Sequence, residues 1–154
     1  MPSNIIEQFV AGRMAMAHVA KSITNEQADI IPAFSNNNVK WNVGHVIVSA
    51  DQFVYGGRNV QSTIPKEYHD FFKSGSKPTA DEAIPFTLEE LCEVLVAQST
   101  EIVKDLKGIL DEKIENPMTI AGMNIRTWED VVLFCAWHEA IHFGVINTLI
   151  KAVK

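Results

Sequence analysis

Apolar residues recur at helical spacing in four long segments of this chain. Residues 4–23, 39–55, 87 to about 108, and 127–154 each carry an apolar stripe of the period expected for an amphipathic helix. No segment shows a convincing strand pattern. The sequence therefore predicts an all-α four-helix bundle, with a single domain covering residues 1–154. Capping pairs mark three of the starts and a short turn after the first helix: Asn4 and Glu7, Thr24 and Gln27, Thr87 and Glu90, and Thr127 and Asp130.

The predicted second and third helices are joined by a long connection, residues 58–86. Prolines and a glycine interrupt it, and an aromatic patch occupies residues 68–72. A connection of this length in a small domain is usually functional or mobile, so we expect it to cover a site opening or to form an oligomer contact. Residues 112–126 form a shorter loop, in which residues 120–125 are a tight turn or a short hairpin.

The last predicted helix carries the strongest chemical signal. His138 and His142 are four residues apart, so they stand one turn above each other on one helix face. Imidazole is the commonest side-chain metal ligand, and this spacing allows two rings to bind one ion. Two polar rings on a largely apolar face need partners, and a shared metal supplies one.

The segment also matches the H-E-x-x-H pattern of zinc proteases, in which the glutamate is the general base. The context does not support that interpretation. The position at which the longer form of the pattern has its third ligand is Thr148, and no acidic residue follows Glu139. A third protein ligand must therefore come from upstream.

His45, in the second predicted helix, is the candidate for that ligand. It shares a polar seam with Asn42, Ser49 and Gln52 on an otherwise apolar helix. Such a seam is either the solvent face or the lining of a site. Gly44 removes side-chain bulk directly before His45, so another helix or a ligand could approach closely there.

Composition narrows the classes of function. The net charge is −6 and the basic residues are scattered, which argues against a nucleic-acid-binding surface. No run of about 18 apolar residues predicts a membrane span. The N-terminal segment has neither the basic nor the apolar region of a signal peptide, and the two cysteines fit reduced thiols, so we expect a cytoplasmic protein.

The motif around His45, Trp41-Asn42-x-Gly44-His45, together with residues 137–144 around His138 and His142, resembles the DinB/YfiT-like superfamily. The resemblance covers essentially the whole chain. It implies a cytoplasmic four-helix bundle in which three histidines hold a divalent metal. Carried over residue by residue, the ligands are His45, His138 and His142. The metal implied is nickel or zinc, and its identity does not transfer.

The resemblance also suggests two chemistries. Three neutral imidazoles leave an ion its charge and an open position, where water or a substrate thiol could bind in its deprotonated form. Characterised thiol transferases of the superfamily act on low-molecular-weight thiols such as bacillithiol or mycothiol. We therefore expect such a small-molecule thiol substrate, with a metal-dependent hydrolase or a non-enzymatic, stress-associated dimerisation module as alternatives. A homodimer is expected, since dimers are the commonest oligomers.

Four neighbouring residues have open roles. Glu139 is a candidate general base or a group that orients a ligand imidazole, and it could equally pair with a neighbouring helix. Cys135 could be a fourth ligand or, as we prefer, part of the apolar core. Asn42 and Gln52 are candidates for the pocket or for contacts to the ligands, with solvent exposure as the alternative.

Overall fold

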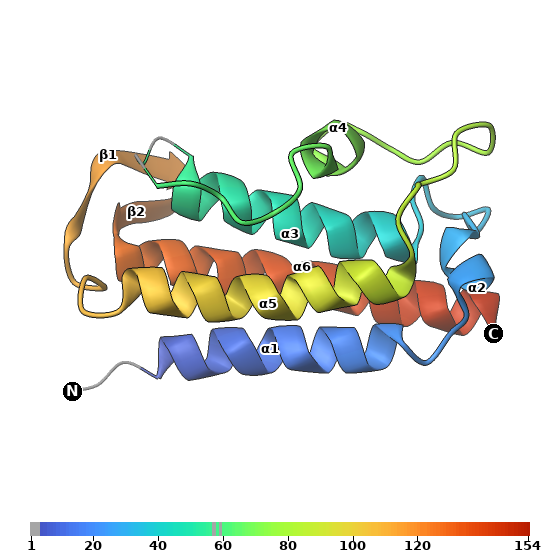
Figure 1. Cartoon of the computed structure of the whole chain (residues 1–154), viewed down its shortest axis with the longest axis horizontal. Coiled ribbons are helices and arrows are strands. Elements are labelled where there is room, and N and C mark those ends of the chain that lie inside the picture. The colour runs from blue at the N-terminus through green and yellow to red at the C-terminus, as the bar shows by residue number, and fades with distance from the viewer. Residues whose placement is uncertain (1–3, 57, 59) are drawn as a thin grey trace.

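Four long helices lie side by side in the computed structural model, which describes residues 4–56, 58 and 60–154. Figure 1 shows that α1 and α6 run in one direction along the bundle and that α3 and α5 run in the other. Both α1 and α3 pack against α5 and α6. The predicted four-helix bundle is therefore confirmed. The bounds are Ile5–Ala20 for α1, Val39–Tyr55 for α3, Leu88–Leu106 for α5 and Trp128–Val153 for α6.

The helix starts follow the capping signals at three of the four predicted positions. Thr24, Thr87 and Thr127 each form a complete capping box. The first of these opens α2, a short helix over Asn25–Asp29. Helix α1 also begins directly after Asn4, as predicted, but the expected capping interaction is missing, because the Asn4 side chain makes no capping hydrogen bond. The start of α3 is capped by Asn38, whose side chain accepts a hydrogen bond from the Trp41 backbone N–H at 2.8 Å.

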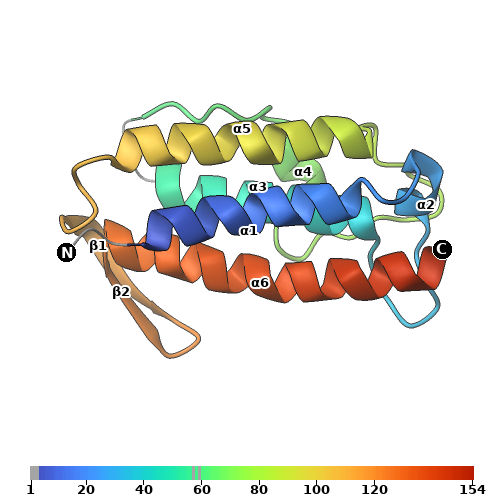
Figure 2. The same cartoon turned by 90° about the horizontal axis from the view of Figure 1, so that it is seen from below.

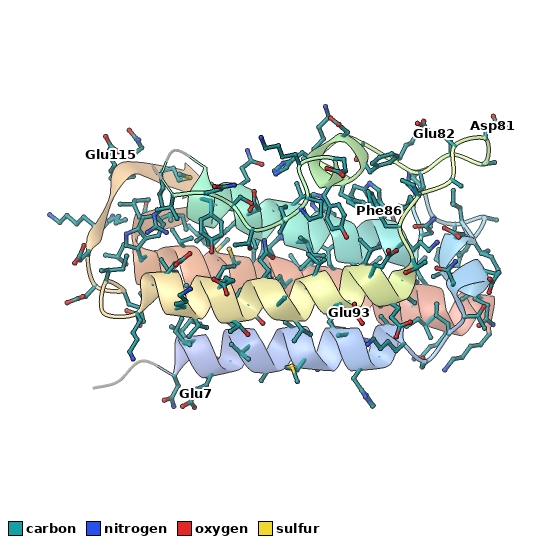
Figure 3. The ribbon with its side chains drawn as sticks, in the orientation of Figure 1. Glu7, Asp81, Glu82, Phe86, Glu93 and Glu115 are labelled. Atoms are coloured by element: carbon teal, nitrogen blue, oxygen red, sulfur yellow. The ribbon has the colours of Figure 1, made fainter. Side chains whose placement is uncertain are left out.

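The long connection before α5 contains a short helix, α4 (Tyr68–Phe72), that the sequence analysis did not resolve. Position 59 of this connection lies outside the described residues. Figure 1 shows α4 lying on the outer side of α3. Phe86, at the entrance to α5 (Figure 3), holds it there through its ring, 4.5 Å from that of Tyr68 and 6.0 Å from that of Phe72.

Gly44 is where α4 approaches α3 most closely. A Cβ atom at this position would lie 2.4 Å from the ring of Phe72, closer than real side chains come. The expectation that the glycine admits a close neighbour is confirmed, and the neighbour is α4.

A β-hairpin joins α5 to α6. Strand β1 (Lys113–Ile120) pairs antiparallel with β2 (Met123–Thr127) around a two-residue turn at Ala121 and Gly122, whose φ angles are 50° and 80°. Two positive φ angles match the twist of hairpin strands. The short hairpin expected over residues 120–125 is present, but it extends to Lys113, so the loop predicted for residues 112–119 is wrong. β1 is almost wholly exposed and lacks the apolar alternation that would have indicated a strand.

Buried apolar residues form two clusters, one at each end of the bundle, with polar residues between them. One cluster lies toward α2, and the other lies toward the hairpin. Between them α1 contributes Arg13, α3 Ser49, α5 Gln98 and α6 Glu139, all buried. Surface acids such as Glu93 point away from the bundle instead (Figure 3). The helices therefore share one internal polar layer.

The outward face of α6 is unusually apolar. Leu133, Trp137 and Ile141 are exposed on it. By length and composition alone, α6 is apolar enough to cross a membrane, although no uninterrupted apolar run was found in its sequence. One such helix is weak evidence for a span, because a core helix of a bundle meets the same criterion. In this structure its other face packs against α1 and α3 (Figure 2).

Gly44→Ala should destabilise the protein by about 1–3 kcal/mol, because the added methyl group overlaps the Phe72 ring and must displace α4. Urea unfolding measures the effect. Gly12→Ala is the matched control: its Cβ would meet nothing within 4 Å, so the same change inside α1 should stabilise by about 0.5–1 kcal/mol. Equal effects at both positions would contradict the close packing of α4.

Candidate metal centre

Three histidine side chains meet between α3 and α6. Because these helices run antiparallel, His45 in the middle of α3 lies opposite His138 and His142, which are one turn apart on α6. The ring centroids are 5.2 Å apart for His45 and His138, 4.8 Å for His45 and His142, and 4.6 Å for His138 and His142. One nitrogen from each ring can be chosen so that all three lie within 4.8 Å of one another. The predicted set of three histidines is thus brought together.

His45 is held by the backbone of α4. Its Nδ1 lies 2.8 Å from the carbonyl oxygen of Phe72, which can only accept, so Nδ1 carries the proton and donates. Nε2 therefore carries a lone pair that can bind a metal; in this structure it accepts a hydrogen bond from the Ser49 hydroxyl at 3.3 Å, which a metal would displace. The indole of Trp41 stacks on the imidazole, with centroids 4.6 Å apart and planes 9° from parallel. The hydrogen bond and the stacking together fix the orientation of the His45 ring.

His142 is oriented in the same way by Asn42. The His142 Nδ1 lies 2.8 Å from the Asn42 Oδ1. The amide nitrogen of Asn42 donates at 2.8 Å to both the Asn38 carbonyl and the Asn37 side-chain oxygen, which fixes which way the amide points. Its oxygen must therefore accept from His142, and the Nε2 of His142 is left with its lone pair. A partner on the second ring nitrogen is a regular feature of metal-binding histidines.

His138 is the least constrained of the three rings. It is half-buried and stacks on Phe134, with centroids 6.3 Å apart and planes 16° from parallel. His142 is also half-buried, whereas His45 is buried. The cluster is therefore buried on the α3 side and partly exposed to solvent on the α6 side.

All three imidazoles are neutral at physiological pH. Burial lowers the pKa of His45, although the hydrogen bond to Phe72 acts in the other direction. Burial, with a further contribution from neighbouring histidines, lowers the pKa of His138 and of His142 to about 4 each. A histidine must be neutral to bind a metal, so these three are in the required form.

The donor set suits a divalent transition metal. Three neutral imidazole nitrogens are ligands that zinc and nickel both accept. Around a tetrahedral ion with bonds of about 2.0–2.1 Å, ligand nitrogens stand about 3.3 Å apart. The observed limit of 4.8 Å is wider, and small rotations of the side chains close the difference. Asn42 and Phe72 already supply the outer partners that such ligands need.

Glu139 does not join this cluster. Its carboxylate faces α1 and binds the buried guanidinium of Arg13, with a shortest contact of 2.6 Å. Arg13 also donates to the Gln98 side chain at 2.7 Å and to the Leu95 carbonyl at 3.2 Å. Burial raises the pKa of the Glu139 carboxyl, and Arg13 opposes that shift. Of the roles considered, pairing with a neighbouring helix is the one that the structure has.

The remaining candidate residues lie in clearly different surroundings. Asn42 contacts a ligand directly, as described above. Cys135 is a free, fully buried thiol in the apolar core, and burial raises its pKa. Gln52 is exposed on α3. His69 lies elsewhere, 3.0 Å from a carboxylate oxygen of Asp51.

The sequence gives little indication of two groups, the acceptor for His45 and the partner of Glu139. The acceptor for His45 is a main-chain carbonyl of Phe72, and the only hint of it is the glycine that lets α4 approach. Arg13 has a weak signal: it lies four residues after Phe9 and three before Met16, inside the apolar stripe of α1. A charge in that position predicts a buried partner.

The comparisons with known proteins support a single family. The model of the DinB superfamily matches residues 8–146, which include α3, α5, most of α1 and α6, and the three histidines. No curated protein sequence matches the chain.

His45→Ala, His138→Ala and His142→Ala should each abolish tight binding of zinc or nickel, because two imidazoles remain where three converge. Asn42→Ala should keep the stoichiometry but weaken affinity by about 10–100-fold, because His142 loses its orienting partner. Competition with a chromogenic chelator measures both effects. His18→Ala, on the exposed side of α1, is the control. Unchanged affinity in all three ligand variants would show that the metal binds elsewhere.

Glu139→Gln should destabilise the fold by about 3 kcal/mol, because Arg13 would remain buried without a compensating charge. Glu101→Gln, which breaks an exposed pair with Lys104, should cost less than about 0.5 kcal/mol. Thermal and urea unfolding measure both changes. Metal affinity of the folded Glu139 variant should stay near that of the wild type. A large loss of metal affinity at unchanged stability would instead assign Glu139 to the metal centre.

Proposed function

Because this chain belongs to the DinB superfamily, we propose that it is a divalent-metal-dependent enzyme that transfers an electrophilic carbon group onto a low-molecular-weight thiol. The convergence of His45, His138 and His142 carries the proposal. A structural metal site closes all four tetrahedral positions with protein ligands, whereas a catalytic site leaves one open. Three histidines, with Glu139 and Cys135 engaged elsewhere, fit the second type.

A zinc or nickel ion at this site would supply Lewis acidity, which lowers the pKa of a thiol or water that coordinates to it. The chain's own contribution is to position and to protect. Phe72 and Asn42 hold two imidazoles in the tautomer that exposes Nε2. Trp41 covers one side of His45 and limits access of water there. The open approach is from the α6 side, past His138 and His142.

The proposed reaction is a nucleophilic substitution. The thiol gives up its proton to solvent, and the thiolate sulfur uses an electron pair to form a bond to the electrophilic carbon. The leaving group departs with the electrons of its former bond to that carbon. Glu139 takes no part in the proton transfer, because Arg13 holds its carboxylate on the side of α6 that faces α1 and α5. The same position of Glu139 weighs against a zinc protease, which needs that carboxylate beside the metal.

Protein loaded with zinc or nickel should accelerate conjugation of monochlorobimane to small thiols such as cysteine or glutathione, measured by the fluorescence of the thioether. His142→Ala and chelated protein should return the rate to that of the uncatalysed reaction, and His18→Ala should retain it. Equal rates with and without metal would refute the proposal. Metal-dependent hydrolysis of nitrophenyl acetate without any thiol effect would favour the hydrolase alternative instead.

A further inference from the structure

A second concave site lies at the hairpin end of the bundle, outside the three-histidine cluster. It is a cavity of about 490 Å³, here called the hairpin cavity, between the end of α3, the hairpin and the start of α6. Figure 1 shows these three segments meeting at that end. The volume falls within the range of about 300–1,000 Å³ typical of small-molecule sites. Its apolar walls are formed by Phe53, Ile114, Met118, Ile125, Trp128 and Val131.

A bulge in β1 opens this cavity. Lys113 pairs with Thr127 and Met118 pairs with Ile125, so five steps along β1 correspond to two along β2. The extra residues include Pro117, which has no N–H to donate to a partner strand. Asn116 and Met118, on either side of the proline, line the cavity. Bulges of this kind are over-represented beside functional sites.

Arg58 gives the cavity a specific charge. The Cζ atom of its guanidinium lies over the indole of Trp128, 4.6 Å from the ring centroid. The one hydrogen bond that its guanidinium makes among the described residues is a long one, 3.5 Å to the Val54 carbonyl, and none of the ion pairs there involves it. An arginine without a carboxylate is notable in a chain with 19 acidic residues and a net charge of −6. Its remaining donors form a fork that fits a carboxylate of a ligand.

The cavity and the histidine cluster share a wall. The ring of Phe53, in the cavity, lies 4.7 Å from that of Phe134, which in turn stacks on the ligand ring of His138. Phe53 is eight residues beyond His45 on α3, a rise of about 12 Å. The cavity and the histidine cluster are therefore neighbours along the seam between α3 and α6, with the packed rings of Phe53 and Phe134 between them.

We propose that the hairpin cavity binds an aromatic or branched apolar carboxylate, with the carboxylate on Arg58 and the apolar group between Trp128 and Phe53. Lys113 adds a second positive charge, while Glu115 is exposed (Figure 3) and offsets one of the two. Two cations against one anion leave the lining with a charge of +1. This binding does not depend on the proposed function.

The test is a titration of metal-free, isotope-labelled protein with naphthylacetate, followed by NMR of the three tryptophan indole N–H signals. The Trp128 signal should move and saturate, while that of Trp137, exposed on the outer face of α6, should stay unchanged. Naphthylacetamide, which has the same apolar body without the charge, should bind about tenfold to a hundredfold more weakly, because it cannot form the charge-assisted pair. This comparison uses two ligands on the same protein, so misfolding of a variant cannot explain its outcome.

Arg58→Gln should weaken naphthylacetate binding by the same factor and remove the preference over the amide. Arg126→Gln is the matched control, since Arg126 is an exposed arginine of the same hairpin that does not line the cavity. Equal affinity for the acid and the amide, or a Trp128 signal that does not move, would overturn the proposal and leave the proposed function standing. Saturable binding without any thiol transfer would support the cavity and count against the proposed function.

Discussion

Each buried polar group in this bundle needs a partner inside the bundle, and this requirement organises the interior. Arg13, Gln98 and Glu139 come from three helices and satisfy one another in one layer between two apolar clusters. No buried side-chain nitrogen or oxygen among the described residues is left without a hydrogen bond. Sliding one helix by a turn would separate the Arg13 and Glu139 charges in a medium that solvates neither. The layer therefore fixes how the helices stand against each other along the axis.

The geometry of the histidine cluster depends on that alignment. Glu139 follows His138 directly on α6, so the ion pair to α1 and the imidazole facing α3 are set by the same turn of helix. One face of the turn provides stability and the other presents the ligands. The H-E-x-x-H pattern has here been divided between two roles: its histidines meet His45, and its glutamate belongs to the core.

The sequence predicted the parts of this structure that depend on local spacing. Three capping boxes, four apolar stripes and the spacing of His138 and His142 were readable because each involves residues three or four positions apart. The third ligand, His45, needed the family resemblance as well as the polar seam. The pairing of Glu139 with Arg13 joins residues 126 positions apart, and the bond from His45 ends on a main-chain carbonyl, so the sequence identifies neither partner. The sequence indicated the hairpin only near its turn; its full length was missed because an exposed two-stranded ribbon needs no apolar alternation.

The acceptor that orients His45 belongs to the backbone of Phe72, not to a side chain. Every amino acid has the same main-chain carbonyl, so no substitution in the connection that carries α4 can remove this acceptor. A substitution of Asn42, in contrast, would remove the acceptor that orients His142. What must persist is the path of the chain past Gly44. The side chains of the covering segment can therefore change while the cluster beneath it keeps its geometry.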